Sequence, residues 1–179
     1  FEPSSKELTY FPKMPFELPE LSHPCGLAFD EKRQRLLVCS LGGKGFLYSF
    51  DKTAKEWSLL GSMNNVDALA MAWSPIEDCL YTISADRRDR TRYALVRMTM
   101  SGIITREVLL GREIPNLGHM PNCQLIPHKE KMVLLAPGPL VGAQRHGRPA
   151  THCYLMNPLT GAVDYATELQ PQPSIVASE

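Results

Sequence analysis

Residues 23–51 read HPCGLAFDEKRQRLLVCSLGGKGFLYSFD, and this stretch decides the fold. It contains three short apolar runs, at 27–29, 36–39 and 46–50, separated first by a polar turn and then by a glycine-rich break. Short apolar runs bounded by Gly, Pro, Asn and Asp are typical of antiparallel strands joined by turns. The segment therefore predicts three neighbouring strands of one sheet.

The same pattern occurs twice more, with apolar runs at 71–73, 80–83 and 94–98 and then at 125–126, 132–135 and 153–156. Trp73 follows Phe29 by 44 positions, and Ile126 follows Trp73 by 53. Each unit ends in a more polar run, at 56–60, 103–110 and 162–169, which predicts a fourth strand. Four strands repeated about every 40–50 residues are typical of a propeller blade, and no stretch has sustained helical periodicity. We therefore predict an all-β, β-propeller-like fold of about three four-stranded antiparallel blades plus an extra outer strand.

The segments outside the repeat predict the domain organisation. Residues 7–18, ELTYFPKMPFEL, alternate weakly and contain two prolines, which is typical of an edge strand. We expect an outer edge strand and lead-in over 1–22, a three-blade unit over 23–169 (blades at about 23–61, 67–111 and 119–169) and a flexible tail over 170–179. Three blades leave two flanks uncovered. We expect the chain to belong to a longer propeller or to pair as a homodimer in a six-bladed ring.

Composition narrows the function classes. Nineteen basic and nineteen acidic residues give zero net charge, which disfavours nucleic acid as a partner. No apolar run approaches the length of a membrane span, and the N-terminal FEPSSKELTYF has no signal-peptide pattern. The five cysteines are odd in number and have no close pairs, which predicts small buried side chains in a soluble protein and favours a reducing compartment such as the cytoplasm.

Propeller topology predicts where ligand-binding residues gather. Loops that lead into each innermost strand lie on the same face as loops joining the second and third strands, and loops on a rigid scaffold carry function. On this predicted loop face we expect ligand-binding side chains at His23, Asn65, Asp67, His119, Asn122, Arg145 and Arg148. Loop 137–150, PGPLVGAQRHGRPA, has cations and no carboxylate, so it predicts an anion site. Loop 85–92, ADRRDRTR, carries its own aspartates, and we interpret it as solvated.

Two further interpretations of the loop face stay open. Asn122 and Asp67 are candidate ligands for a divalent metal, although Asn and Asp are also the usual residues of tight turns. The face could also be an interaction platform without chemistry, because propellers host many unrelated functions. The chain contains no Gly-x-Ser-x-Gly, phosphate-loop, HExxH or dinucleotide-binding motif.

The phrases HPCGLAFDEKRQRLLVCS (23–40) and MPNCQLIPHKEKMVLL (120–135) resemble the repeated PNGLAFSPDGKxLYV pattern of six-bladed propellers. These include NHL-repeat proteins and the senescence-marker/gluconolactonase group, and the resemblance covers most of residues 20–170. In the gluconolactonase group the Asn of this phrase helps to hold a divalent metal for lactone hydrolysis, and Asn122 matches it. Cys25 and Leu69 lie near that position in the other units, and the group's acidic metal ligands have no counterpart in a recognisable motif here.

Together these observations predict a binding or interaction scaffold. It would present a polar, arginine-rich loop face to a protein partner or a small anionic ligand, with no cofactor expected. The alternative is a metal-dependent lactonase of the gluconolactonase type, which would need a divalent cation.

Overall fold

A computed structural model of the chain describes residues 12–13, 24–40, 45–63, 66, 68–85, 92–111, 114, 123–137 and 151–169. These residues form three four-stranded antiparallel sheets in which consecutive strands pair in chain order. The first sheet contains β1 (Pro24–Asp30), β2 (Arg35–Ser40), β3 (Gly45–Asp51) and β4 (Glu56–Met63).

The other two sheets repeat this meander. The second contains β5 (Ala68–Ser74), β6 (Cys79–Ala85), β7 (Tyr93–Met98) and β8 (Ile104–Leu109). The third contains β9 (Gln124–His128), β10 (Lys131–Pro137), β11 (Thr151–Met156) and β12 (Val163–Leu169). The predicted all-β repeat is therefore confirmed strand by strand.

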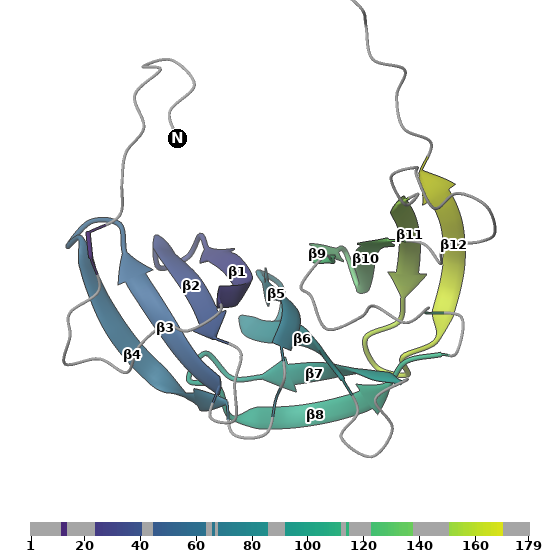
Figure 1. Cartoon of the computed structure of the whole chain (residues 1–179), viewed down its shortest axis with the longest axis horizontal. Helices are drawn as coiled ribbons and strands as arrows, with labels where there is room; N and C mark the ends of the chain where they lie inside the picture. Colours follow the sequence, from purple (N-terminus) through teal and green to yellow (C-terminus); the bar gives the residue numbers. More distant parts are fainter. Residues whose placement is uncertain are drawn as a thin grey trace, which may run out of the picture.

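The three sheets stand side by side in an arc (Figure 1). The first strands β1, β5 and β9 lie on the inside of the arc and contact one another in sequence, while β4, β8 and β12 follow the outer rim. This radial arrangement of four-stranded sheets is that of propeller blades. The predicted strand within 1–22 lies outside the described residues, apart from Pro12 and Lys13; the Pro12 carbonyl accepts a hydrogen bond from Trp57 Nε1 at 2.8 Å.

The core consists of two apolar layers, one at each junction between sheets, and β5 contributes to both. Met71 and Trp73 on one face of β5 pack against the first sheet. Ala70 and Ala72 on the other face pack in the layer shared with the third sheet. Because both faces are covered, every residue of β5 is buried and the strand is almost continuously apolar.

Trp73 is a core residue, as its place at the end of an inner strand predicts. The sequence comparison aligned it with Ile126, however, and this alignment is wrong. Trp73 pairs with Leu80, and the corresponding pair in the third sheet is Pro127 with Met132. The turn between β9 and β10 is two residues shorter than the turn between β5 and β6, which shifts the comparison by one position.

Glycines bring neighbouring sheets together at the outer rim. Gly161, in the turn before β12, has a φ of +72°, and a Cβ added there would collide with the Leu109 carbonyl oxygen of β8. A Cβ on Gly61 of β4 would likewise collide with the carbonyl oxygen of Ser101 in the second sheet. Each later sheet is thus seated on the outermost strand of the sheet before it.

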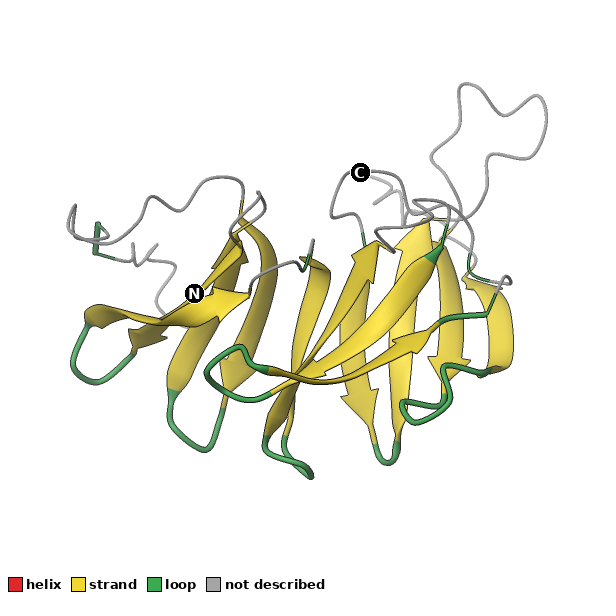
Figure 2. Cartoon of the chain, turned by 90° about the horizontal axis from the view of Figure 1, so that it is seen from below, coloured by secondary structure: helices red, strands yellow, loops and turns green. Residues whose placement is uncertain are grey.

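The tight turns within the sheets share one end of the molecule, which we call the turn face. It comprises residues 31–34, 52–55, 75–78, 99–103, 129–130 and 157–162, and Figure 2 shows most of these turns at the lower end of the strands. The predicted loop face belongs to the other ends of these strands, and most of its loop residues are outside the described part of the chain. Within the part of the chain that is described, no helix is long and apolar enough to cross a membrane.

Candidate binding site

The first junction on the turn face is closed by an ionic cluster. Arg33 of the first sheet donates from Nη1 and Nη2 to the two carboxylate oxygens of Asp78 in the second sheet, at 2.7 and 2.8 Å. Lys32 adds a 2.6 Å ion pair to Asp78, and these bonds hold the pKa of that carboxyl well below its usual range. Behind them, the fully buried Asp30 accepts from Arg33 Nη1 at 3.0 Å and from Arg35 Nε at 2.9 Å.

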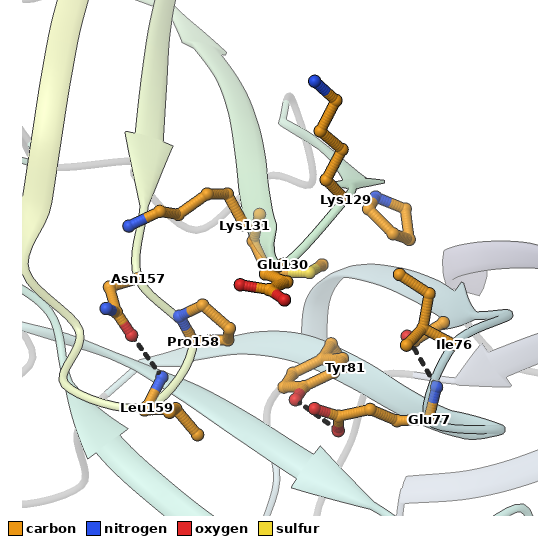
Figure 3. A pocket seen from close by; sticks show the side chains of 12 residues that line it. Ile76, Glu77, Tyr81, Lys129, Glu130, Lys131, Asn157, Pro158 and Leu159 are labelled. Carbon is orange, nitrogen blue, oxygen red and sulfur yellow. Dashed lines mark hydrogen bonds between the residues drawn. The ribbon is translucent and has the colours of Figure 1, made fainter.

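The second junction is open at the same level and holds a pocket of about 340 Å³, which we call the junction pocket (Figure 3). Its walls come from three turns and the strand ends beside them, around residues 74–77, 127–132 and 157–159, with Tyr81 between them. In the turn after β5, Glu77 takes the place that Arg33 has in the turn after β1, but it bonds within its own sheet. The shorter turn of the third sheet leaves the remaining space unfilled.

Glu77 and Tyr81 form one wall of the pocket. The buried Tyr81 hydroxyl donates to Glu77 Oε2 at 2.8 Å, and Arg97 Nε donates to the same oxygen at 2.7 Å. The bond from Arg97 is the main cause that lowers the pKa of Glu77, whereas burial raises the pKa of Tyr81. The Glu77 carboxylate is therefore ionised, and its charge is balanced by Arg97.

The opposite wall belongs to the third sheet. Lys131 Nζ forms a 2.7 Å ion pair with Asp164, and Asn157 Oδ1 accepts a 2.8 Å hydrogen bond from the Leu159 amide, which shapes the turn before β12. In Figure 3 the Glu130 carboxylate points towards the pocket, whereas the Lys129 ammonium points away from it. Among the described residues, neither Glu130 nor Lys129 has a hydrogen-bond or ion-pair partner.

Two large aliphatic side chains border the pocket from opposite sheets. Ile76 is 67% exposed and Leu159 is 58% exposed, although both lie in turns that are otherwise polar. Pro127 and Pro158 add further apolar surface between them. Apolar walls with a few convergent polar groups are typical of binding sites.

A buried thiol lies beside the Glu77 wall of the pocket. The nearest thiol, Cys79, donates to Glu77 Oε2 at 3.5 Å, and burial raises its pKa to about 11, so it is protonated at neutral pH. Within the described ranges, no group of three or more His, Cys, Asp or Glu side chains is placed to hold a metal ion.

The structure does not describe the ligand residues expected from the sequence. All seven fall outside the described residues: His23, Asn65, Asp67, His119, Asn122, Arg145 and Arg148. Of the two arginine-rich loops only the ends are described; Arg92 is half-buried there, and its Nε has no hydrogen-bond partner. The expected anion and metal sites therefore stay predictions.

The junction pocket is not among the sites predicted from the sequence; it lies on the turn face, at the other end of the strands from the predicted loop face. A signal for it was present, because Ile76 and Leu159 are large aliphatic residues inside turn segments rich in Pro, Asn, Asp and Gly. Single exposed aliphatic side chains are common on protein surfaces, but these two lie on opposite sides of one pocket.

The three sheets define a fold of the β-propeller type. A chain in the crystal structure of a nidogen/laminin complex superimposes with a TM-score of 0.53 at 10% sequence identity, covering 83% of this chain and 48% of that one. Two other solved chains have lower TM-scores. Hydrazine synthase of Kuenenia stuttgartiensis has a TM-score of 0.49 at 13% sequence identity, covering 82% of this chain and 37% of that one. The β-propeller domain of the trilobed protease from Pyrococcus furiosus has a TM-score of 0.44 at 12% sequence identity, covering 83% of this chain and 43% of that one.

The likeness to the chain of the nidogen/laminin complex supports the fold and nothing more specific. The chain spans less than half the length of each of the three solved chains. No protein-family model matches the sequence, and no curated protein matches it either.

Proposed function

We propose that this chain is a binding scaffold that holds a peptide segment of a protein partner on its turn face, across the junction pocket. The single observation that carries the proposal is the exposure of Ile76 and Leu159 on opposite sides of a pocket of about 340 Å³. A partner that covers these two side chains removes their apolar area from water, which stabilises the complex by about 25 cal/mol for each Å² buried.

The rigidity of the surroundings supports the same proposal. The pocket is built on strand ends and short turns, and its walls rest on the buried side chains Tyr81 and Met132. The Asn157 side chain fixes the backbone beside Leu159 through hydrogen bonds to the amides of Leu159 and Thr160. A preformed site loses little conformational entropy when a ligand binds, which favours recognition.

The proposal is tested by selecting peptides from a phage-displayed random library on the purified full chain. Enriched peptides are then measured by fluorescence anisotropy against the wild-type chain and against the double variant Ile76→Ser/Leu159→Ser. We expect the double variant to weaken binding at least tenfold. The matched control is Ile103→Ser, because Ile103 is 65% exposed, lies in another turn and does not line the pocket. Equal binding to wild type and double variant would refute this location.

The two functions expected from the sequence remain as predictions. A site for phosphate or carboxylate at Arg145 and Arg148 predicts that their double replacement by alanine abolishes binding of an anionic probe such as citrate. The lactonase alternative predicts that Ca²⁺ raises the melting temperature by binding the folded state, and that Asn122→Ala removes this rise. A scaffold without metal chemistry predicts no rise in either protein.

A further inference from the structure

We infer that the junction pocket receives a basic side chain, lysine or arginine, from the bound peptide. This inference rests on the proposed function, because it specifies which chemistry the same pocket recognises. It follows from the balance of charges at the pocket and from the shape of the apolar surface around them.

The charges around the pocket leave one negative group uncompensated. Glu77 is paired with Arg97, and Lys131 is paired with Asp164, so neither pair contributes net charge. The Lys129 ammonium is directed away from the pocket, whereas the Glu130 carboxylate is directed towards it (Figure 3). Glu130 thus offers both oxygens to a donor, and ammonium and guanidinium groups are the donors that bind carboxylates most strongly.

The surface around Glu130 suits the stem of such a side chain. Ile76, Pro127 and Pro158 line the pocket between the two sheets, and an aliphatic stem can lie against them while its charged end reaches the carboxylate. An acidic side chain would meet the uncompensated Glu130 carboxylate and be repelled. A neutral aliphatic side chain would cover the apolar surface but leave the Glu130 carboxylate beside it without a donor.

The test uses the peptides selected on the wild-type chain. In each pocket-dependent peptide, every lysine or arginine is replaced in turn by norleucine, which keeps an aliphatic stem and removes the charge. We expect one such replacement to weaken binding to the wild-type chain by roughly two- to fivefold, the range for an exposed ion pair. High salt should reduce this difference, because it screens an exposed pair.

A charge-neutralising variant separates the role of Glu130 from general electrostatics. In Glu130→Gln the parent and norleucine peptides should bind equally, whereas in Glu107→Gln the difference should persist. Glu107 is an exposed glutamate on β8 outside the pocket, so this control changes net charge by the same amount.

The possible outcomes distinguish the two proposals. Pocket-dependent peptides that contain no basic residue, or whose norleucine versions bind the wild-type chain equally well, overturn the inference and leave the proposed function standing. A basic residue whose contribution survives in Glu130→Gln overturns the inference as well. If no selected peptide depends on Ile76 and Leu159, the proposed function fails and the inference fails with it.

Discussion

Asp30 offers the sharpest test of how the first and second sheets are held together. Its side chain is completely buried, and it accepts hydrogen bonds from Arg33 Nη1, from Arg35 Nε and from the Arg33 backbone amide at 3.1 Å. In Asp30→Asn the shape of the side chain is kept, but the negative charge is lost and an amide group must face a guanidinium.

The expected loss of stability follows from how deeply Asp30 and its two arginine partners are buried. Breaking a buried ion pair by removing one partner costs about 3–5 kcal/mol when the other charge is left uncompensated. Here the arginine side chains are 36% and 17% exposed, and Arg33 keeps Asp78, so part of this cost is avoided. We expect Asp30→Asn to lower the free energy of unfolding by about 2–3 kcal/mol, which for a chain of this size lowers the melting temperature by about 4–12 °C.

The measurement is urea unfolding followed by circular dichroism, with Asp164→Asn as the matched control. Asp164 also pairs with a cation, but Lys131 and Asp164 are 37% and 42% exposed. Exposed pairs contribute at most about 1 kcal/mol, so the control should change stability little. If Asp30→Asn costs no more than Asp164→Asn, the buried carboxylate does not hold the junction and the reasoning is wrong.

Three further predictions follow from the rim, the pocket and the cysteines. Gly161→Ala should lower the free energy of unfolding by more than about 1 kcal/mol, and by more than Gly102→Ala does. Both positions have a positive φ, but only at Gly161 would an added Cβ collide with backbone. Equal losses of unfolding free energy in the two variants would contradict this. The pKa of Glu77 is lower in the folded state than its ordinary value of 4.5, so the ionised carboxylate stabilises the fold above that pH and this stabilisation is lost as the pH falls. Glu77→Gln should therefore lower the free energy of unfolding at pH 7 and lower it progressively less towards pH 3, as urea titrations would measure. Iodoacetamide at pH 8 should modify the half-buried Cys153 before Cys79, because burial shields Cys79 and raises its pKa. Peptide mapping by mass spectrometry would show the order, and the reverse order would mean that burial does not protect Cys79.

Much of the fold could be predicted from the sequence because its signals are local. Alternating apolar runs and the turn residues between them indicate each strand without knowledge of its neighbours, and their recurrence indicates equal sheets. The full burial of β5 agrees with this, because its continuous apolar run ALAMAWS is typical of a strand covered on both faces.

The junction pocket could not be predicted in the same way. Its two walls belong to different sheets whose lining residues are more than 40 positions apart in sequence, and they meet only because the second and third sheets pack side by side. The difference between the two junctions depends on where single side chains point: Arg33 reaches across to Asp78, whereas Glu77 turns back to Arg97. No local pattern in the sequence carries that information.

The seating of each sheet on the outermost strand of the sheet before it also bears on how the protein forms during translation. The strands of each sheet are consecutive, so the first sheet can fold from residues 24–63 before the rest of the chain has left the ribosome. Met71 and Trp73 can then pack against the apolar face of the first sheet, and Gly161 can later pack against β8. During synthesis the N-terminal units of a chain are the first that can fold. The arc can therefore be assembled one sheet at a time, in the order in which it is translated.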